Sequence, residues 1–330
     1  MMKRAQPEVE IIGFLRAKEG AYASGQTISR ALGISRTAVW KHIVSLRKAG
    51  YPIEGSSRKG YMLLKPGSPP FNAPFNAIEL SSAVSTETIG RDIHFFPSLD
   101  STNAKALALA RDGAPEGTVV VADSQERGRG RLGRKWISPA GTNLYTSVIL
   151  RPAIPPHMAQ TLTLLSAVAV AETIALFSPV TPAVKWPNDI LVDSRKVAGI
   201  LTEMSSETDR INFVVIGIGV NVNWDMKNAP DEIRRTATSL KEKKGADVPR
   251  VEFVAALYSS LEKWYKIFNK EGRLPIVKAW RGWFNGEGKP VKVKGSPDTK
   301  GLCLGIDDFG ALLVRLSSGN IARVVAGDVE

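Results

Sequence analysis

Hydrophobic residues near the start of the chain recur every three or four positions, a spacing typical of helices with one buried face. Ser24 and Ser35 stand where helix N-caps are expected, and Gly33 stands where the helix after Ser24 must end. Two short apolar runs follow, joined by a turn of Gly, Ser, Arg and Lys, which is the pattern of a β-hairpin. The predicted helices are 8–17, 24–32 and 35–48, and the predicted strands are 51–54 and 60–64. Together they predict a winged helix-turn-helix domain over residues 1–65.

One face of the third predicted helix and the tip of the hairpin carry polar and basic side chains. In helix-turn-helix proteins the second helix of the motif enters the major groove, and basic side chains nearby contact backbone phosphate. The candidate DNA-binding residues are Arg36, Thr37, Trp40, Lys41, Arg58 and Lys59. Residues 1–65 hold twelve Lys or Arg and four Glu, so +8 of the net charge of +12 lies there and favours a polyanionic partner. The alternatives are a protein-docking module whose charges face water and a Trp40 that is half buried.

The pattern changes twice beyond residue 65. Proline and glycine from Lys65 to Pro70 predict a linker over 66–73, and strand and helix patterns then mix over 74–284, which predicts a central mixed α/β domain. Its expected strands are 92–97, 118–122, 142–150, 196–201 and 211–220, with 184–192 a strand interrupted by a polar turn, and its expected helices are 104–111, 157–176, 251–269 and 274–284. Residues 285–330 show short strands between hairpin turns, at 290–293, 302–306, 311–315 and 320–324, which predict a small β-barrel. The predicted fold class is therefore multi-domain α+β.

The composition is that of a globular protein from a reducing compartment. Hydrophobic residues make up 43% of the 330, which is enough for a core. We expect no apolar run of membrane-spanning length, and the Met-Met-Lys-Arg start lacks the apolar stretch of a signal peptide. The single cysteine, Cys303, cannot form an internal disulfide, and there is no Cys/His cluster for zinc. These features predict a cytoplasmic protein without a membrane partner.

The segment from Gly128 to Trp136 combines three glycines with three arginines and one lysine. Glycine lets backbone approach a ligand closely, and guanidinium groups suit phosphate or carboxylate. The segment joins two predicted core strands, so we interpret it as a lid over an anionic ligand that repels itself and moves when the ligand is absent. A solvated basic loop or a nucleic-acid patch is the alternative.

Six short motifs, in order between residues 101 and 240, are similar to those of the biotin protein ligase family. The two most specific are Gly-Arg-Gly-Arg-x-Gly-Arg-x-Trp at 128–136 and Lys-Trp-Pro-Asn-Asp at 185–189. The others are Ser-Thr-Asn at 101–103, Arg-Lys-Val-Ala-Gly-Ile-Leu at 195–201, Gly-Ile-Gly-Val-Asn-Val-Asn at 217–223 and Thr-Ser-Leu at 238–240. With a winged helix in front, the chain resembles the bifunctional ligase and repressor branch of that family. Leu132 stands where some relatives have arginine, which bears on the charge of the lid and not on the chemistry.

The resemblance implies a class II synthetase-like ligase domain, an SH3-like barrel over residues 285–330 and a two-step reaction. Family members use biotin and ATP with Mg²⁺ to make biotinyl-5′-adenylate, and they release pyrophosphate. They then transfer biotin to one lysine of the carrier domain of a carboxylase, so the expected activity is that of a biotin–[acetyl-CoA-carboxylase] ligase. The adenylate-bound form is expected to form a homodimer and to bind two-fold operator DNA as a biotin-responsive repressor.

The same resemblance implies roles for individual residues. Lys196 would contact the biotin carboxylate and the α-phosphate, and Asp189 would orient the acceptor amine or help to hold Mg²⁺, with no other metal site expected. The expected catalytic residues are Lys196, Arg131, Asp189 and Lys185. The expected biotin-binding residues are Ser101, Thr102, Asn103, Gln125, Arg129, Gly130, Arg131 and Lys196. The residues expected at ATP or the adenylate are Arg129 on the phosphate side, Asn221 near the adenine, and Arg131, Trp136 and Asn188.

Two other functions share parts of this pattern. A lipoate-type ligase has a related fold, but the Gly-Arg-Gly-Arg lid speaks against it. A regulator that senses biotin without ligating it would keep the winged helix, but the intact Lys196, Arg131 and Asp189 favour an enzyme. From the residues alone, the hydroxyls at 101–102 also fit a helix cap, and the polar pair at 188–189 also fits a turn.

Overall fold

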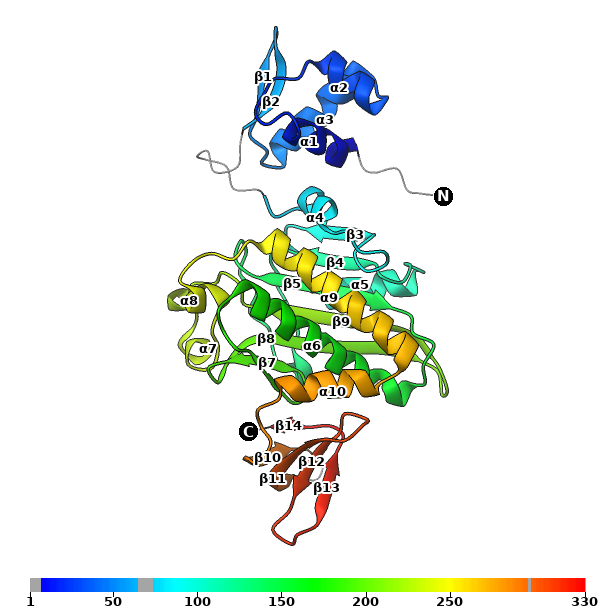
Figure 1. Ribbon diagram of the computed structural model, residues 1–330, viewed down its shortest axis with the longest axis vertical. Helices are drawn as coiled ribbons and strands as arrows, with labels where there is room; N and C mark the ends of the chain where they lie inside the picture. The colour runs from blue at the N-terminus through cyan, green and yellow to red at the C-terminus, as the bar shows by residue number, and fades with distance from the viewer. Residues whose placement is uncertain (1–6, 65–73, 296–297, 330) are drawn as a thin grey trace. The chain divides into compact units, whose positions relative to one another are not determined.

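The computed structural model describes residues 7–64, 74–295 and 298–329, and the chain divides into two compact units, Met1–Ala83 and Val84–Glu330 (Figure 1). The predicted linker, 66–73, lies outside the described residues. The winged helix, the mixed α/β layer and the C-terminal strands are all present, so the predicted fold class is confirmed.

The first unit is a winged helix followed by one further helix. Its elements are α1 (Pro7–Arg16), α2 (Gly25–Leu32), α3 (Arg36–Lys48), β1 (Ile53–Ser56), β2 (Gly60–Leu63) and α4 (Ala77–Ala83). Ser24 and Ser35 are N-caps whose hydroxyls accept the N–H groups of Thr27 and Ala38, and Gly33 ends α2 with φ 65°. The two strands pair from Ile53↔Leu63 to Ser56↔Gly60, so the hairpin turn is shorter than the sequence indicated. The apolar face of α3 is fully buried in the core of this unit.

Helix α4 packs within the first unit and not where the sequence boundary placed it. The Arg16 guanidinium contacts both carboxylate oxygens of Glu79, at 2.6 and 2.7 Å, and the Tyr51 hydroxyl donates to the same carboxylate at 2.5 Å. Burial and this carboxylate raise the pKa of Tyr51 well above its usual range. Ile78 packs on the winged-helix core. A boundary at residue 74 therefore divides groups that are in contact.

The second unit is built on a seven-stranded mixed sheet with the strand order β3-β4-β5-β9-β8-β7-β6. Its strands are β3 (Ile93–Phe96), β4 (Val119–Ala122), β5 (Leu144–Leu150), β6 (Ala183–Lys185), β7 (Asp189–Val192), β8 (Arg195–Ser206) and β9 (Ile211–Val220). Among the neighbouring strands described in this sheet, β3 and β4 are parallel and the other pairs are antiparallel. Residues 184–192 are a hairpin and not one interrupted strand, because the polar turn reverses the chain between β6 and β7.

Helices cover the two faces of this sheet. They are α5 (Thr102–Arg111), α6 (Ala159–Phe177), α9 (Arg250–Glu271) and α10 (Leu274–Trp283), with the short α7 (Asp231–Thr236) and α8 (Leu240–Lys244) after β9. Along β9, Phe213 and Val215 face α5, and Thr202 of β8 contacts Thr163 of α6 on the other side. In Figure 1, α6, α9 and α10 lie together in front of the sheet. Because side chains alternate along a strand, Gly217 and Gly219 lie on the α5 face.

One expectation about apolar runs is wrong. Residues Pro156–Phe177 are long and apolar enough to cross a membrane, with a mean hydropathy of 1.6. Two-thirds of this apolar stretch is buried inside the protein, where α6 packs against α9, α10 and the sheet. Length and hydropathy alone do not separate a membrane span from a core helix, and the burial here is that of a core helix.

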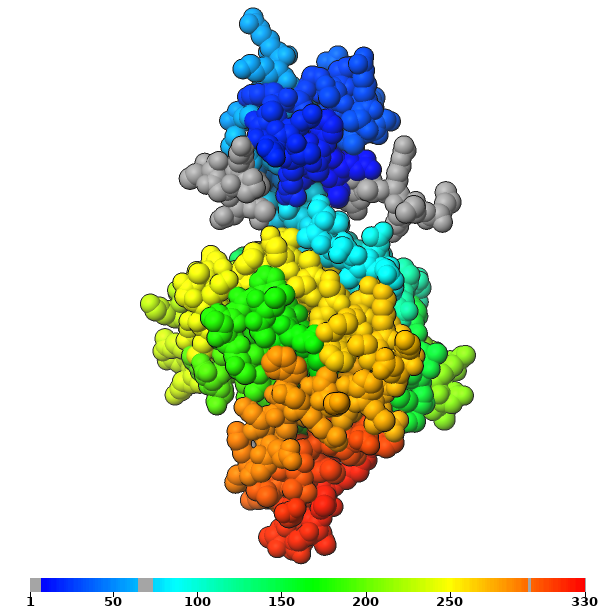
Figure 2. Space-filling view, in the orientation of Figure 1, coloured from blue at the N-terminus to red at the C-terminus, as the bar shows by residue number. Residues whose placement is uncertain are grey.

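The C-terminal part is a five-stranded antiparallel sheet with the order β13-β12-β11-β10-β14. Its strands are β10 (Pro290–Lys294), β11 (Thr299–Ile306), β12 (Leu312–Arg315), β13 (Ile321–Val324) and β14 (Asp328–Val329), of which the last was not predicted. The indole N–H of Trp186 and the amide of Gln160 both donate to the Gly310 carbonyl, at 3.0 and 2.8 Å. Figure 2 shows this part, orange to red, in continuous contact with the rest of its unit.

Candidate active site

A cavity between the lid and the sheet has a pair of glycines as its floor. Gly199 and Gly219 are direct partners across β8 and β9, and both lie on the α5 face. The Trp136 indole rests on them: a Cβ at Gly219 would lie 2.6 Å from the ring, and one at Gly199 would lie 3.0 Å from it. The absence of two side chains therefore creates a flat slot for a ring. The indole N–H in this slot is buried and has no hydrogen-bond partner, so it is free to donate to a ligand.

One end of the cavity is lined by neutral hydrogen-bonding groups at the N-terminus of α5. Thr102 donates to Gln125 Oε1 from its backbone N–H at 2.8 Å and from its hydroxyl at 3.1 Å. Gln125 Nε2 donates to Ser138 Oγ at 2.9 Å. Ser101 caps the helix and is almost fully buried, like Thr102. This end offers donors and acceptors without net charge, which suits a neutral polar ring.

Asn103 ties this end to the sheet. Its Nδ2 donates to Leu201 O at 3.2 Å and to Glu203 Oε2 at 2.8 Å, and its Oδ1 accepts from the Ser147 hydroxyl at 2.6 Å. A Cβ at Gly217 would lie 2.1 Å from Asn103 Oδ1, so only glycine fits below it. Asn103 lines the cavity, but every polar atom of its side chain is already used within the protein. Its place is therefore that of a support for the floor.

The lid folds over the cavity as a short hairpin. The Gly130 N–H donates to Arg134 O at 2.7 Å, and the Trp136 N–H donates to Gly128 O at 2.9 Å. A Cβ at Gly128 would lie 2.3 Å from Trp136 O, so the glycine is what allows this closure. Leu132, at the tip, has φ 54° and is 74% exposed. The expectation that the lid moves without ligand stays a prediction.

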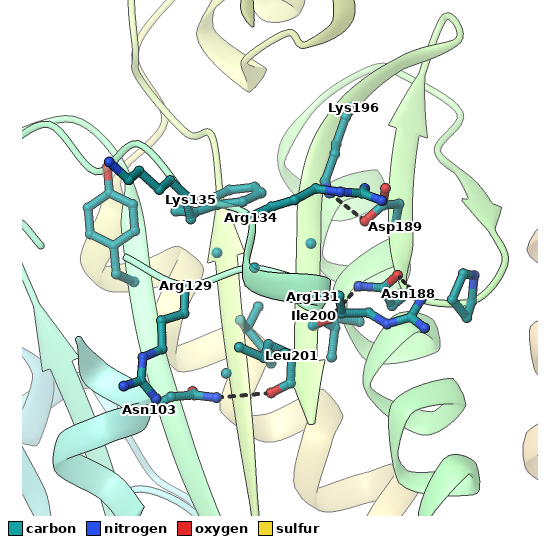
Figure 3. Close-up of a pocket in the computed structure, with 18 of the residues that line it drawn as sticks. Asn103, Arg129, Arg131, Arg134, Lys135, Asn188, Asp189, Lys196, Ile200 and Leu201 are labelled. Carbon is teal, nitrogen blue, oxygen red and sulfur yellow. Dashed lines mark hydrogen bonds and ion pairs between the residues drawn. The ribbon is translucent and has the colours of Figure 1, made fainter. Parts of the chain in front are cut away.

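Arg129 points to one end of the cavity, and the other two lid arginines, Arg131 and Arg134, point to the other (Figure 3). The Arg129 guanidinium lies 3.8 Å from Glu203, near Asn103, so it is at the neutral end, and its expected role at the phosphate stays a prediction. Arg131 donates to Asn188 Oδ1 at 3.2 Å and lies at the opposite end. Burial lowers the pKa of Arg131, and the nearby Asp189 opposes that shift.

The charged end centres on Lys196 and Asp189. The Lys196 ammonium lies 2.6 Å from Asp189 Oδ1 and 5.3 Å from the centroid of the Trp136 ring. Asn188 is fixed because its Nδ2 donates to Ile200 O at 2.6 Å. Six cationic side chains and two carboxylates line the cavity: Arg129, Arg131, Arg134, Lys135, Lys185, Lys196, Asp189 and Asp328. This excess of positive charge suits a polyanion. Residues 7–64, 74–295 and 298–329 contain no group of three His, Cys, Asp or Glu arranged to hold a metal.

The structure brings together all but one of the predicted site residues of this unit. The exception is Asn221, which is buried, does not line the cavity, and donates from Nδ2 to Thr238 O at 3.1 Å. Sequence reasoning missed Asp328 and Val329 of β14, which line the charged end, and Glu203 beside Arg129. Asp328 contacts both Arg131 and Arg134. The sequence gives little sign of a role for Asp328, because its arginine partners lie almost two hundred positions away along the chain.

The predicted DNA-binding residues form an exposed basic face on the first unit. All six are exposed: Arg36, Thr37, Trp40, Lys41, Arg58 and Lys59. Trp40 is 56% exposed, so it is not half-buried core. The Lys59 ammonium lies 5.6 Å from the centroid of the Tyr22 ring, next to the hairpin. A large exposed aromatic among cations suits contact with a polyanion.

Known proteins match each part of the chain. Residues 95–221 match the biotin/lipoate A/B protein ligase family, residues 9–62 match an HTH domain, and residues 288–330 match the biotin protein ligase C-terminal domain. The bifunctional ligase/repressor BirA of Bacillus subtilis is 42% identical over 94% of each chain. This chain belongs to the BirA family of bifunctional ligase/repressors.

Other relatives of the BirA family agree with this assignment. The Escherichia coli protein of the same name is 32% identical over 94% of this chain and 93% of its own. The biotin protein ligase of Aquifex aeolicus, solved in complex with biotin and ATP, covers 73% of this chain and 98% of its own, with 29% identity and a TM-score of 0.64. The resemblance drawn from the six motifs is therefore confirmed.

Proposed function

We propose that this protein is an ATP-dependent biotin protein ligase and a biotin-responsive transcriptional repressor. Biotin and ATP react to give biotinyl-5′-adenylate and pyrophosphate, and biotin then passes to one lysine of the carrier domain of a carboxylase. The protein acts in the cytoplasm. The observation that carries the enzymatic part is one cavity with two unlike ends: neutral amides and hydroxyls around Thr102 and Gln125, and cations around Lys196.

Biotin matches these two ends. Its ureido ring is neutral and needs both donors and acceptors, which Ser101, Thr102 and Gln125 supply. Its valerate chain runs past the Trp136 indole, which lies over Gly199 and Gly219, and its carboxylate reaches the charged end. The Arg129 side chain, balanced by Glu203, leaves the ureido end without a net charge.

In the first step a carboxylate oxygen of biotin attacks the α-phosphorus of ATP, and pyrophosphate leaves. Two anions must approach each other, so the main task of the protein is electrostatic. Lys196, Lys185 and Arg131 offset the charge of the carboxylate and of the phosphorane-like transition state. Asp189, 2.6 Å from Lys196, holds that ammonium in position before substrates arrive. When Mg²⁺ is bound with ATP it would add positive charge at the phosphates, and Asp189 is the residue that would help to hold it.

In the second step the amine of the acceptor lysine attacks the carbonyl carbon of the mixed anhydride, and AMP leaves. Asp189 accepts a hydrogen bond from the incoming amine and orients it. The closed lid excludes water, which would otherwise hydrolyse the anhydride. Trp136 covers the adenylate, and Asn188 keeps Arg131 at the phosphate. A place for Asn221 near the adenine would require a rearrangement, because its side chain holds the Thr238 carbonyl.

The repressor part rests on the exposed face of the first unit. Arg36, Thr37, Trp40 and Lys41 enter the major groove, and the hairpin tip contacts phosphate. The adenylate favours a homodimer, in which two winged helices read the two halves of the operator. Binding of the adenylate must lower the free energy of the dimer more than that of the monomer for this coupling to work.

The test is incorporation of labelled biotin into a carboxylase carrier domain with ATP and Mg²⁺, by the wild-type protein and by Lys196→Ala. Transfer by the wild type and none by the variant is the expected result. If the wild type binds biotin and transfers none, the protein is a biotin sensor and the ligase proposal is wrong.

A further inference from the structure

The C-terminal strand places a carboxylate inside a cavity that otherwise collects cations. Asp328 of β14 is 18% exposed and contacts two lid arginines: Oδ1 lies 3.6 Å from Arg131 Nη1, and Oδ2 pairs with Arg134. Arg131 also donates to the carbonyl of Gly327 at 3.3 Å. Two adjacent residues from the end of the chain thus supply three acceptors to the lid.

The Asp328 carboxylate contacts the two lid arginines that the proposed reaction needs for the phosphates of ATP. Arg131 is 24% exposed, and a desolvated guanidinium requires a nearby negative charge. Without nucleotide, Asp189 and Asp328 supply that charge together. With nucleotide, the phosphates need the same arginines, and a carboxylate at that position repels them. Asp328 and the phosphates of ATP therefore compete for Arg131 and Arg134.

The attachment of β14 allows such an exchange. Among the described residues the strand is two residues long, and its pairs with β10 are Val293↔Val329 and Lys294↔Asp328, at the edge of the sheet. Gly327, just before it, has φ 152°, and a Cβ there would lie 2.6 Å from Val293 Cγ1. A short edge strand after a glycine can shift at low cost because few hydrogen bonds hold it.

We propose that Asp328 is a positioning residue: it occupies the phosphate position of the lid arginines until ATP replaces it. The proposal rests on the proposed ligase function, because ATP is the anion that takes over the two guanidinium groups. It assigns the C-terminal sheet a part in the first half-reaction. The lid is thereby held near its working position, with its cations already facing inward, before substrates bind.

The test compares Asp328→Asn with the wild type, with Asp328→Glu as the conservative variant. Asp308→Asn is the matched control, because Asp308 lies in the turn between β11 and β12 of the same C-terminal part and pairs with an arginine outside the cavity, Arg281, at 3.4 Å. The first measurement is the KM for ATP in biotin-dependent release of pyrophosphate. The second is the rate of tryptic cleavage within residues 128–136 in the absence of ligands, followed by mass spectrometry.

We expect Asp328→Asn to lower the KM for ATP about fivefold, the effect of removing one partly buried competing charge, and to speed cleavage of the unliganded lid. Asp328→Glu should lie between the two, and Asp308→Asn should match the wild type. A raised KM for ATP would show that Asp328 helps to bind ATP. An unchanged KM with unchanged cleavage would show that Asp328 has no role in the lid. Either result would contradict the proposal that ATP replaces Asp328 at the two arginines. If the wild type forms no adenylate, the proposed function fails, and the cleavage assay still decides whether Asp328 holds the lid.

Discussion

Replacing Lys196 and Arg131 by alanine should impair different steps, because the two cations have different surroundings. Lys196 lies 2.6 Å from Asp189 at the charged end of the cavity, where its side chain is 32% exposed. Its removal takes one oriented cation from the reacting centre and leaves Asp189 unbalanced next to two incoming anions. The loss of one such group costs a factor of about 10²–10³ in rate, or roughly 3–4 kcal/mol. Adenylate formation by Lys196→Ala should therefore fall at least a hundredfold, as expected for about 3 kcal/mol.

Arg131 belongs to the lid, and its contacts join the lid to both sides of the cavity. It donates to Asn188 at 3.2 Å and to Gly327 O at 3.3 Å, with Asp328 at 3.6 Å. Loss of charged hydrogen bonds of this kind costs about 1.5–3 kcal/mol. Arg131→Ala should therefore lose less adenylate synthesis than Lys196→Ala, because Lys196 and Lys185 remain at the reacting centre, and should release the adenylate roughly ten to a hundred times faster.

Single-turnover measurements separate the two effects. Excess enzyme is mixed with labelled biotin and ATP, adenylate formation is followed by quenching, and its release is followed by dilution into unlabelled biotin. Lys263→Ala is a suitable control, since Lys263 pairs with Glu172 at 2.7 Å on the helical layer, outside the cavity. Equal loss of adenylate synthesis in the Lys196 and Arg131 variants, with equal release rates, would refute the division of roles.

Three further outcomes follow from other parts of the structure. Burial alone would raise the pKa of Glu262, but three backbone N–H donors at 87–89 lower the pKa below its ordinary 4.5. The ionised Glu262 therefore stabilises the fold above pH 4.5. This stabilisation is lost as the pH falls through the lowered pKa of the folded state. Glu262→Gln should lose about 1–2 kcal/mol of unfolding free energy at pH 7 and progressively less below pH 4.5, and denaturant titrations showing a pH-independent loss would contradict this. Arg36→Ala should weaken binding to duplex DNA selected on the wild type by about tenfold while biotin transfer stays unchanged, so equal DNA affinity by fluorescence anisotropy would count against the groove contact. Gly60→Ala adds a Cβ 2.2 Å from Ala23 O at φ 97°, and should lower the unfolding free energy of the first unit by about 1–3 kcal/mol; an unchanged thermal midpoint would disprove that strain.

Local sequence patterns were sufficient to predict most helices and strands, because caps, turns and buried faces depend on residues that are close in sequence. The caps Ser24 and Ser35 bond within their own first turns, and the apolar face of α3 is set by helical spacing. The lid was recognisable for the same reason: its glycines and arginines are contiguous. What the sequence could not show was how far its arginines diverge, because the partner of Arg129 lies on β8 and that of Arg131 lies in the turn between β6 and β7.

Contacts between distant segments account for the differences. Asn221 ends a strand as an active-site residue would, but its side chain turns inward to Thr238, which only the folded chain reveals. Asp328 lies in a two-residue strand, too short for a periodic pattern. The apolar stretch at 156–177 was underestimated because polar residues inside it, such as Ser166 and Thr173, bond to their own helix and are buried.

The attachment of α4 to the winged helix determines where the chain can be cut. A shortened enzyme that began at residue 74 would keep Ile78 and Glu79 but lose the core and the Arg16 and Tyr51 groups that surround them. It would present an uncovered apolar side chain and an unbalanced carboxylate to solvent, both of which favour aggregation and fraying. A chain that begins at Val84 leaves those groups behind. Expression of the two truncated forms side by side should therefore give more monodisperse protein for the shorter one.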